Sequence, residues 1–227
     1  MAGALKADWL ERAAPVAGLI GPAAIGACSV AAAIAYRGRD DELYFPLNHF
    51  VSELGELDVS ALAVLFNSGL IVGGLCFATF MVGFGRMRGG LGGTAYAVLG
   101  ALAGIAGAAV GVFPMNAIRV HTIAASAFFD LAWIAVAIAS VDLLVRPDGR
   151  FQARLAALGF GAVAAVVAFI WAYAFAAAAR GSGLQPPPAR PSVDVTSILE
   201  WVALISVIAW TSAVALAWRR AQRVGAT

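Results

Sequence analysis

His49 and Glu53 stand four residues apart in the stretch FPLNHFVSELG, residues 45–55, within a chain that is otherwise rich in alanine, valine, leucine and glycine. Side chains at this spacing are neighbours on a helix. An imidazole beside a carboxylate is a pair that general acid–base catalysis uses, and Asn48 and Ser52 add hydrogen-bonding groups beside it. The alternative is that both side chains simply meet water, because an exposed pair contributes only a few tenths of a kcal/mol and requires no function.

Asp130 is the second candidate, because it follows a long apolar stretch in GVFPMNAIRVHTIAASAFFD, residues 111–130. It lies about 10 residues into an expected membrane span, hence about 15 Å deep, where insertion of an aspartate costs ~2.5–3.5 kcal/mol. It must therefore be paired, protonated or exposed to a hydrated cavity. Around the helix, Arg119 lies about 20° and Ser126 about 40° from Asp130, whereas His121 lies nearly opposite.

Polar residues on other spans lie at a depth similar to that of Asp130, among them Asn67 and Trp210. Together they indicate a polar pocket that opens outward toward Arg119 and the 45–55 segment. The alternative, which stays open, is structural hydrogen bonding between helices. The candidate catalytic residues are thus Glu53, His121, Asp130 and His49, and the candidate ligand-binding residues are Asn48, Ser52, Asn67, Arg119, Ser126 and Trp210.

The elements that must position these residues are membrane helices. The chain has 227 residues, of which 62% are hydrophobic and 12% charged. Six apolar runs reach the roughly 20 residues that a helix needs to cross a bilayer. We therefore predict an all-α integral membrane protein, with six transmembrane helices bundled in a single membrane domain, residues 1–227, and spans at about 14–36, 60–84, 94–113, 120–145, 155–179 and 197–218.

A short helix is expected outside the spans, at the external membrane interface. Pro46 suits a first helical position and Gly55 the residue after a helix end, while Leu47, Phe50, Val51 and Leu54 repeat at helical spacing. The segment should lie at the interface with its polar side toward headgroups or a cavity.

Four glycines follow one face of the span 94–113, at positions 100, 104, 107 and 111. Small residues let helix backbones approach closely in lipid, so this span should pack tightly and lie centrally.

The basic residues predict the orientation. Ten of them fall on the side of the termini and five on the other side, so both termini should be cytoplasmic in a multi-pass protein of the cell membrane. The formal net charge of +2 hides this asymmetry, which indicates topology rather than nucleic-acid binding. Near the inner end of the fourth span, Asp142 should pair with Arg146 at helical spacing.

Three stretches resemble a known family: VSELG after the first span, LFNSGLIVGGL in the second, and GVFPMNAIRVHTIAASAFF across the third and fourth. They are similar to the bacterial and archaeal membrane-protein family catalogued as domain of unknown function nine-ninety-eight, over roughly residues 14–218. That family resembles, more remotely, the eukaryotic FRAG/DRAM/SFK group, which is linked to lipid-anchor remodelling, autophagy and phospholipid asymmetry. The resemblance supports the fold and implies no particular activity.

Three functional hypotheses remain. The first is an outward-opening polar pocket that binds a lipid headgroup or similar amphiphile, with Arg119 meeting a phosphate. The second is a membrane-embedded enzyme that modifies a lipid or isoprenoid by His/carboxylate acid–base or metal chemistry, so whether the protein is an enzyme stays open. The third is a proton-coupled transporter with Asp130 as its carrier group, which the lack of a visible inverted repeat disfavours.

No cofactor and no metal is predicted. Lys6 is the only lysine and lies outside every span, so a retinal Schiff base has no anchor. Two histidines at one rim cannot ligate hemes on both sides of a membrane, and His49, Glu53 and His121 would make a sparse metal site. The expected partner is membrane lipid, nucleic acid is excluded, and a homo-oligomer is left open.

Overall fold

The computed structural model describes residues 2–180 and 190–224. Within these ranges the chain forms six long α-helices, two short 3-10 helices and no β-strand. The long helices are α1 (Ala2–Ala35), α2 (Ala63–Arg88), α3 (Gly90–Val112), α4 (Ile118–Val145), α5 (Ala153–Arg180) and α6 (Val195–Val224), and the short ones are η1 (Val51–Gly55) and η2 (Met115–Ala117). All six long helices are long and apolar enough to cross a membrane, which confirms the predicted fold class.

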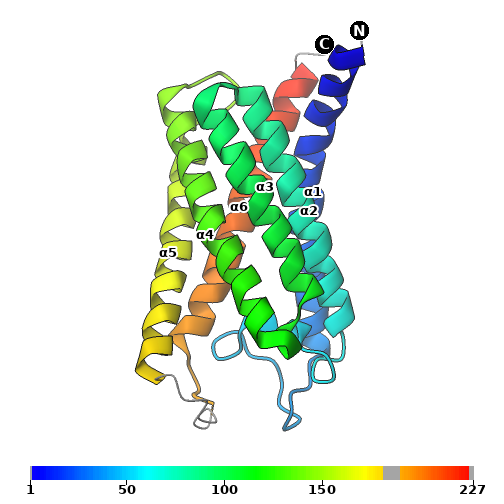
Figure 1. Cartoon of the computed structure of the whole chain (residues 1–227), viewed down its shortest axis with the longest axis vertical. Coiled ribbons are helices and arrows are strands. Elements are labelled where there is room, and N and C mark those ends of the chain that lie inside the picture. The colour runs from blue at the N-terminus through cyan, green and yellow to red at the C-terminus, as the bar shows by residue number, and fades with distance from the viewer. Residues whose placement is uncertain (1, 181–189, 225–227) are drawn as a thin grey trace.

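Consecutive helices run antiparallel in one bundle, and α1 begins at the same end at which α6 finishes (Figure 1). We call this the termini end. The opposite end, over which residues 36–62 fold, is called the capped end. At the termini end only Gly89 separates α2 from α3, and Gly89 and Gly90 have φ of 67° and 69°. Glycine adopts this left-handed conformation without strain, so the chain reverses direction in a minimal turn.

The helices are mostly longer than the predicted spans. α1 begins at Ala2 rather than at about 14, and α6 ends at Val224 rather than at about 218. The length of an apolar run limits only the part of a helix inside the hydrocarbon. Backbone hydrogen bonding continues the helix into the polar interface, where the apolar pattern no longer marks it.

The glycine face of α3 brings its backbone against α2. A Cβ built on Gly104 would lie 2.5 Å from the carbonyl oxygen of Gly74, and one on Gly74 would lie 2.4 Å from the amide nitrogen of Ala108. The prediction of a central position is wrong, because the main neighbours of α3 are α2 and α4. The large buried rings gather instead around Trp210 of α6, together with Phe80 and Phe84.

The predicted interfacial helix forms only in part. Residues 46–49 make turns, and the helical part is the five-residue 3-10 helix η1, whose Val51 and Leu54 are buried in the bundle. One hydrogen bond explains the shorter helix. The Phe50 N–H donates to the Glu53 carboxylate at 2.8 Å and is thereby withdrawn from a helix beginning at Pro46. The Phe50 carbonyl accepts from the Glu53 N–H at 3.2 Å, which begins η1, and also from the Tyr44 hydroxyl at 2.9 Å.

A buried ion network joins the helices at the termini end. Asp142 accepts from Arg146 Nε at 2.5 Å, which confirms the pair predicted from their spacing, and from Arg88 Nε at 2.6 Å. Arg88 also donates to Asp148 at 2.8 Å. The carboxylate of Asp142 thus ties the end of α2 to the end of α4 and to the following turn.

Candidate functional site

Glu53 lies in the capped end, where it forms an ion pair with Arg190 from just before α6. Arg190 donates from Nη2 to Glu53 Oε2 at 2.8 Å and from Nη1 to Oε1 at 3.1 Å. The hydrogen bonds to Glu53 raise the pKa of the Arg190 guanidinium above its ordinary value. Glu53 is only 7% exposed. The interpretation that it simply meets water is therefore wrong, and both of its oxygens are engaged.

His49 is buried in an aromatic cluster with Tyr36 and Tyr44. The Asn48 side-chain N–H donates to the Pro191 carbonyl at 3.0 Å, so its Oδ1 faces His49 and accepts from Nδ1–H at 2.7 Å. His49 Nε2 has no hydrogen-bond partner among the described residues and lies 3.9 Å from Glu42 Oε1. Burial lowers the pKa of His49 below its ordinary value, against the opposing field of Glu53.

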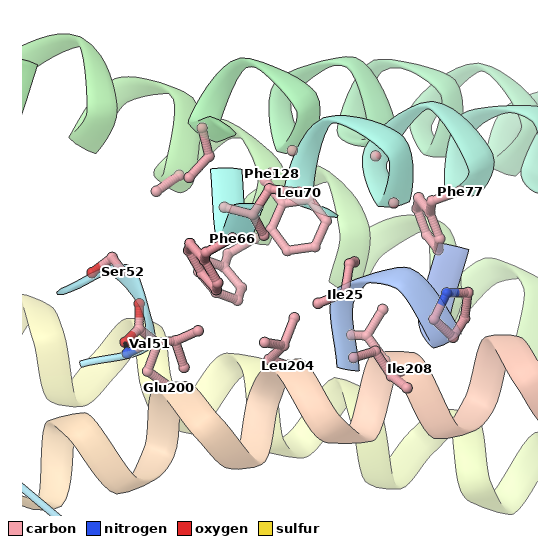
Figure 2. Close-up of a pocket in the computed structure, with 18 of the residues that line it drawn as sticks. Ile25, Val51, Ser52, Phe66, Leu70, Phe77, Phe128, Glu200, Leu204 and Ile208 are labelled. Atoms are coloured by element: carbon pink, nitrogen blue, oxygen red, sulfur yellow. Dashed lines mark hydrogen bonds between the residues drawn. The ribbon is translucent and has the colours of Figure 1, made fainter. Parts of the chain in front are cut away.

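An apolar cavity of about 90 Å³ lies inside the bundle, between α1, α2, α3, α4 and α6. Its walls are mainly Ile25, Phe66, Leu70, Phe77, Phe128, Leu204 and Ile208. Figure 2 shows Ser52, Val51 and Glu200 at one end of this space and the apolar side chains along it. Thr211 also lines the cavity; its hydroxyl is buried and finds no hydrogen-bond partner in the described part of the chain.

A wider groove of about 540 Å³ lies between α4 and α5. It is bordered by apolar side chains that include Phe169, Ile170 and Tyr173, and it contains Ser126 and Asp130. Asp130 is exposed, and no hydrogen bond or ion pair of this residue is found within the described parts of the chain. Pairing with another described side chain is therefore not seen, and a protonated carboxyl group and a hydrated cavity both stay predictions.

The groove and the cavity share the polar residues Ser52, His121 and Glu200. Glu200 is 9% exposed and accepts a 2.6 Å hydrogen bond from the backbone N–H of Val51. The backbone and side chain of Ser52 also hydrogen-bond to this carboxyl group. No cation pairs with Glu200 within the described residues. This buried acid, held by the capped end, is the polar point at which the two spaces meet.

His121, in the first turn of α4, lies at the same polar point. Its Nδ1–H donates to the Phe113 carbonyl at 2.9 Å, because a carbonyl oxygen can only accept. In the neutral imidazole, Nε2 is then the acceptor nitrogen. His121 is 7% exposed and lines both spaces.

The remaining predicted residues lie elsewhere. Asn67 donates to the Gly55 carbonyl at 2.9 Å and so holds η1 onto α2. Trp210 is fully buried in the aromatic core and lines neither space. Arg119 is exposed and also lines neither. The structure therefore brings Ser52, His121, Ser126 and Asp130 together, and separates them from the Glu53 and His49 network.

Two partners were missed by sequence reasoning. Glu200 was not among the candidate residues, and nothing in its neighbours along the chain indicates that η1 covers it. Arg190 pairs with Glu53 across 137 positions of sequence. A carboxylate inside a predicted apolar span was the available signal for Glu200. Among the described residues, no three His, Cys, Asp or Glu side chains are grouped to hold a metal ion.

The chain was also compared with known proteins. A family model described as "Protein of unknown function (DUF998)" matches residues 5–217. This is the family that the three sequence stretches resemble; the more remote resemblance to the FRAG/DRAM/SFK group is not tested by the match. No curated protein and no solved structure matches the chain.

Proposed function

This chain belongs to the DUF998 family of membrane proteins, and we propose that it binds an amphiphile whose polar group lies at Ser52, His121 and Glu200. These three residues line both the inner cavity and the groove between α4 and α5, and this shared polar point is the observation that supports the proposal most. A molecule with one polar and one apolar part matches a polar point beside an apolar cavity.

The groove provides the access. It lies along α4 and α5, whose outward residues such as Trp171 and Phe175 are exposed and suited to lipid. The capped end closes the bundle above Glu200 through Val51 and Leu54. An amphiphile would therefore arrive sideways from the membrane, and its apolar part would lie against Phe129 or pass on into the inner cavity.

The charges indicate which polar group fits. Asp130 and Glu200 line the groove, and no lysine or arginine lines it within the described residues. A phosphate at Arg119, the sequence-based expectation, would lie outside both spaces. Carboxyl groups and a neutral imidazole instead favour a group that donates hydrogen bonds or carries positive charge, such as an ammonium or a hydroxyl. We propose an amine- or hydroxyl-bearing lipid as the ligand class.

Native mass spectrometry of the purified full-length protein tests this proposal. The probes are phosphatidylethanolamine, diacylglycerol and phosphatidic acid with identical acyl chains, and the readouts are retained lipid and the shift in Tm in wild type and in a variant that fills the groove. Wild type should retain the ethanolamine lipid or diacylglycerol and the filled variant should not, whereas retention of phosphatidic acid, whose headgroup has neither an amine nor an alcohol hydroxyl, should be equal in the two proteins.

The matched variants are A125W and I123W. Ala125 lines both spaces, whereas Ile123 on the same helix is 70% exposed and lines neither. A125W should lose the lipid and its stabilisation, and I123W should keep both. Retention of the same amount of lipid by a folded A125W protein, or no retained lipid in wild type, would overturn the proposal.

A membrane-embedded enzyme is the second candidate, and His121 is the residue that favours it. With Nδ1–H committed to Phe113, Nε2 is left to accept a proton from a hydroxyl or water bound near Glu200. Incubation with the same lipids should then give a new product by mass spectrometry, and H121Q should abolish this product even at lipid concentrations that compensate for weaker binding. Binding without any product in wild type would leave the binding protein as the function.

A further inference from the structure

A second groove lies at the termini end, between the beginning of α5 and the end of α6. These two helices diverge toward that end (Figure 1). The space between them measures about 900 Å³ and lies on the opposite side of the membrane span from the Glu200 site. None of its lining residues belongs to the site described above.

The charged side chains of this groove are all positive. Arg150, Arg154 and Arg220 line it, and no aspartate or glutamate does so within the described residues. Arg150 is paired with Asp148 at 2.9 Å. Arg154 and Arg220 have neither a hydrogen bond nor an ion pair from their side chains to any described residue. The N-terminus of α5 at Ala153 adds the positive end of a helix dipole.

The rest of the groove is apolar and faces the bilayer. Leu155 and Leu158 of α5 form one wall, and Ala213, Leu216 and Ala217 of α6 form the other. Leu158 and Leu216 are 38% and 44% exposed, which leaves the groove open to lipid tails. From Arg220 to Ala213 the apolar wall extends about 10 Å into the membrane.

We propose that this groove binds an anionic phospholipid, with the phosphate between Arg154 and Arg220 and an acyl chain along Leu155 and Leu216. Positive charge at the membrane surface with an apolar groove directly beneath it matches a molecule with an anionic head and a hydrocarbon tail. A free phosphate would use the arginines alone and leave the apolar walls without a role, so the lipid is the occupant that fits both features.

Lipid-dependent unfolding of the full-length protein tests this assignment. Tm is measured in neutral detergent with added phosphatidylglycerol, phosphatidylcholine of the same chains, or inorganic phosphate. Phosphatidylglycerol should stabilise wild type more than phosphatidylcholine does, and inorganic phosphate should not stabilise it. The double variant R154Q/R220Q should bind phosphatidylglycerol about 25-fold more weakly, at about fivefold for each arginine.

The matched control is R219Q/R223Q, which removes the same charge from the same end of α6 but from residues that do not line the groove. It should retain wild-type affinity for the lipid. A217W keeps every arginine but fills the groove, so it should bind phosphatidylglycerol as weakly as the R154Q/R220Q variant does. If R154Q/R220Q does not fold, A217W tests the assignment in its place. Equal stabilisation by both phospholipids, by free phosphate, or an equal loss in the control would overturn the assignment.

Discussion

At the scale of single residues, Glu200 is the group on which the candidate site depends. Its carboxyl is buried and receives only neutral donors, from Val51 and Ser52. Burying a charged carboxyl group without a cation lowers the stability of the folded protein. Removing the carboxyl group also lowers it, because the buried donors of Val51 and Ser52 then lose their acceptor. The two costs can be separated by substitution.

We expect Glu200→Gln to change the free energy of unfolding little, because the amide oxygen still accepts from the Val51 N–H. Glu200→Leu should lower it by about 1–3 kcal/mol, since the buried donors lose their partner. Thermal unfolding in detergent, followed by tryptophan fluorescence, measures both. If the glutamine variant is as unstable as the leucine variant, the charge itself must contribute to the fold.

His49 should make the stability of the capped end depend on pH. Burial lowers the pKa of the folded imidazole, so the unfolded chain binds a proton at this residue more readily. The free energy of unfolding is then constant above about pH 6.5 and decreases as the pH falls from that value through the lower pKa of the folded state. The charged and titratable groups that act on His49 are Glu42, Glu53 and Arg190.

Tm measured between pH 7.5 and pH 5 tests this dependence, with His49→Gln as the comparison. The variant should be less stable at neutral pH but should lose less Tm on acidification than wild type. Identical slopes in the two proteins would assign the acid sensitivity to other groups.

At this scale the sequence predicts which residue types are unusual, but not their partners. The spacing of Asp142 and Arg146 follows from helix geometry alone, and the structure confirms their pair. The depth of Asp130 in the membrane stays a prediction. His49 and Glu53 do not hydrogen-bond to each other. His49 donates to Asn48 instead, and Glu53 accepts from Arg190. Partners that come from distant segments leave no periodic signal in the chain.

At the scale of elements, the contact between α2 and α3 is the most constrained one. Their backbones meet at Gly74 and Gly104, where added Cβ atoms would collide with backbone atoms rather than with movable side chains. Apolar length and glycine spacing were enough to predict the spans and this close packing. They did not predict that the short helix would begin only at Val51, because the Phe50 N–H donates to the Glu53 side chain instead of to a helical carbonyl.

We expect Gly74→Ala to destabilise the bundle by about 1–3 kcal/mol, because the helices must separate to admit the methyl group. Gly26→Ala on α1 is the matched control, since beyond the adjoining backbone of α1 no atom of the described residues lies within 4 Å of a Cβ built there. It should be neutral or stabilise by up to about 1 kcal/mol through helix propensity. Unfolding in mixed micelles measures both, and similar stability of the two variants would contradict the close contact.

At the scale of the whole molecule, the two ends are closed in different ways. The capped end is covered by the chain itself, through η1 and the Glu53–Arg190 pair. At the termini end, no described segment covers the Arg154 and Arg220 groove in this way. Each proposed lipid site therefore opens sideways into a different leaflet. The site with carboxyl groups favours a positively charged or hydroxyl-bearing headgroup, and the site with arginines favours an anionic one.

The orientation of these ends is the last prediction, and it follows from the basic residues. Ten lie at the termini end and five at the capped end, and lysine and arginine are retained on the cytoplasmic side. Cysteines are introduced as G149C and D40C into a C28A/C76A background, since both sites are exposed. A membrane-impermeant maleimide should label D40C in intact cells and G149C only after permeabilisation. The reverse pattern would contradict the assignment and would move the arginine groove away from the cytoplasmic leaflet, where anionic lipids are most abundant.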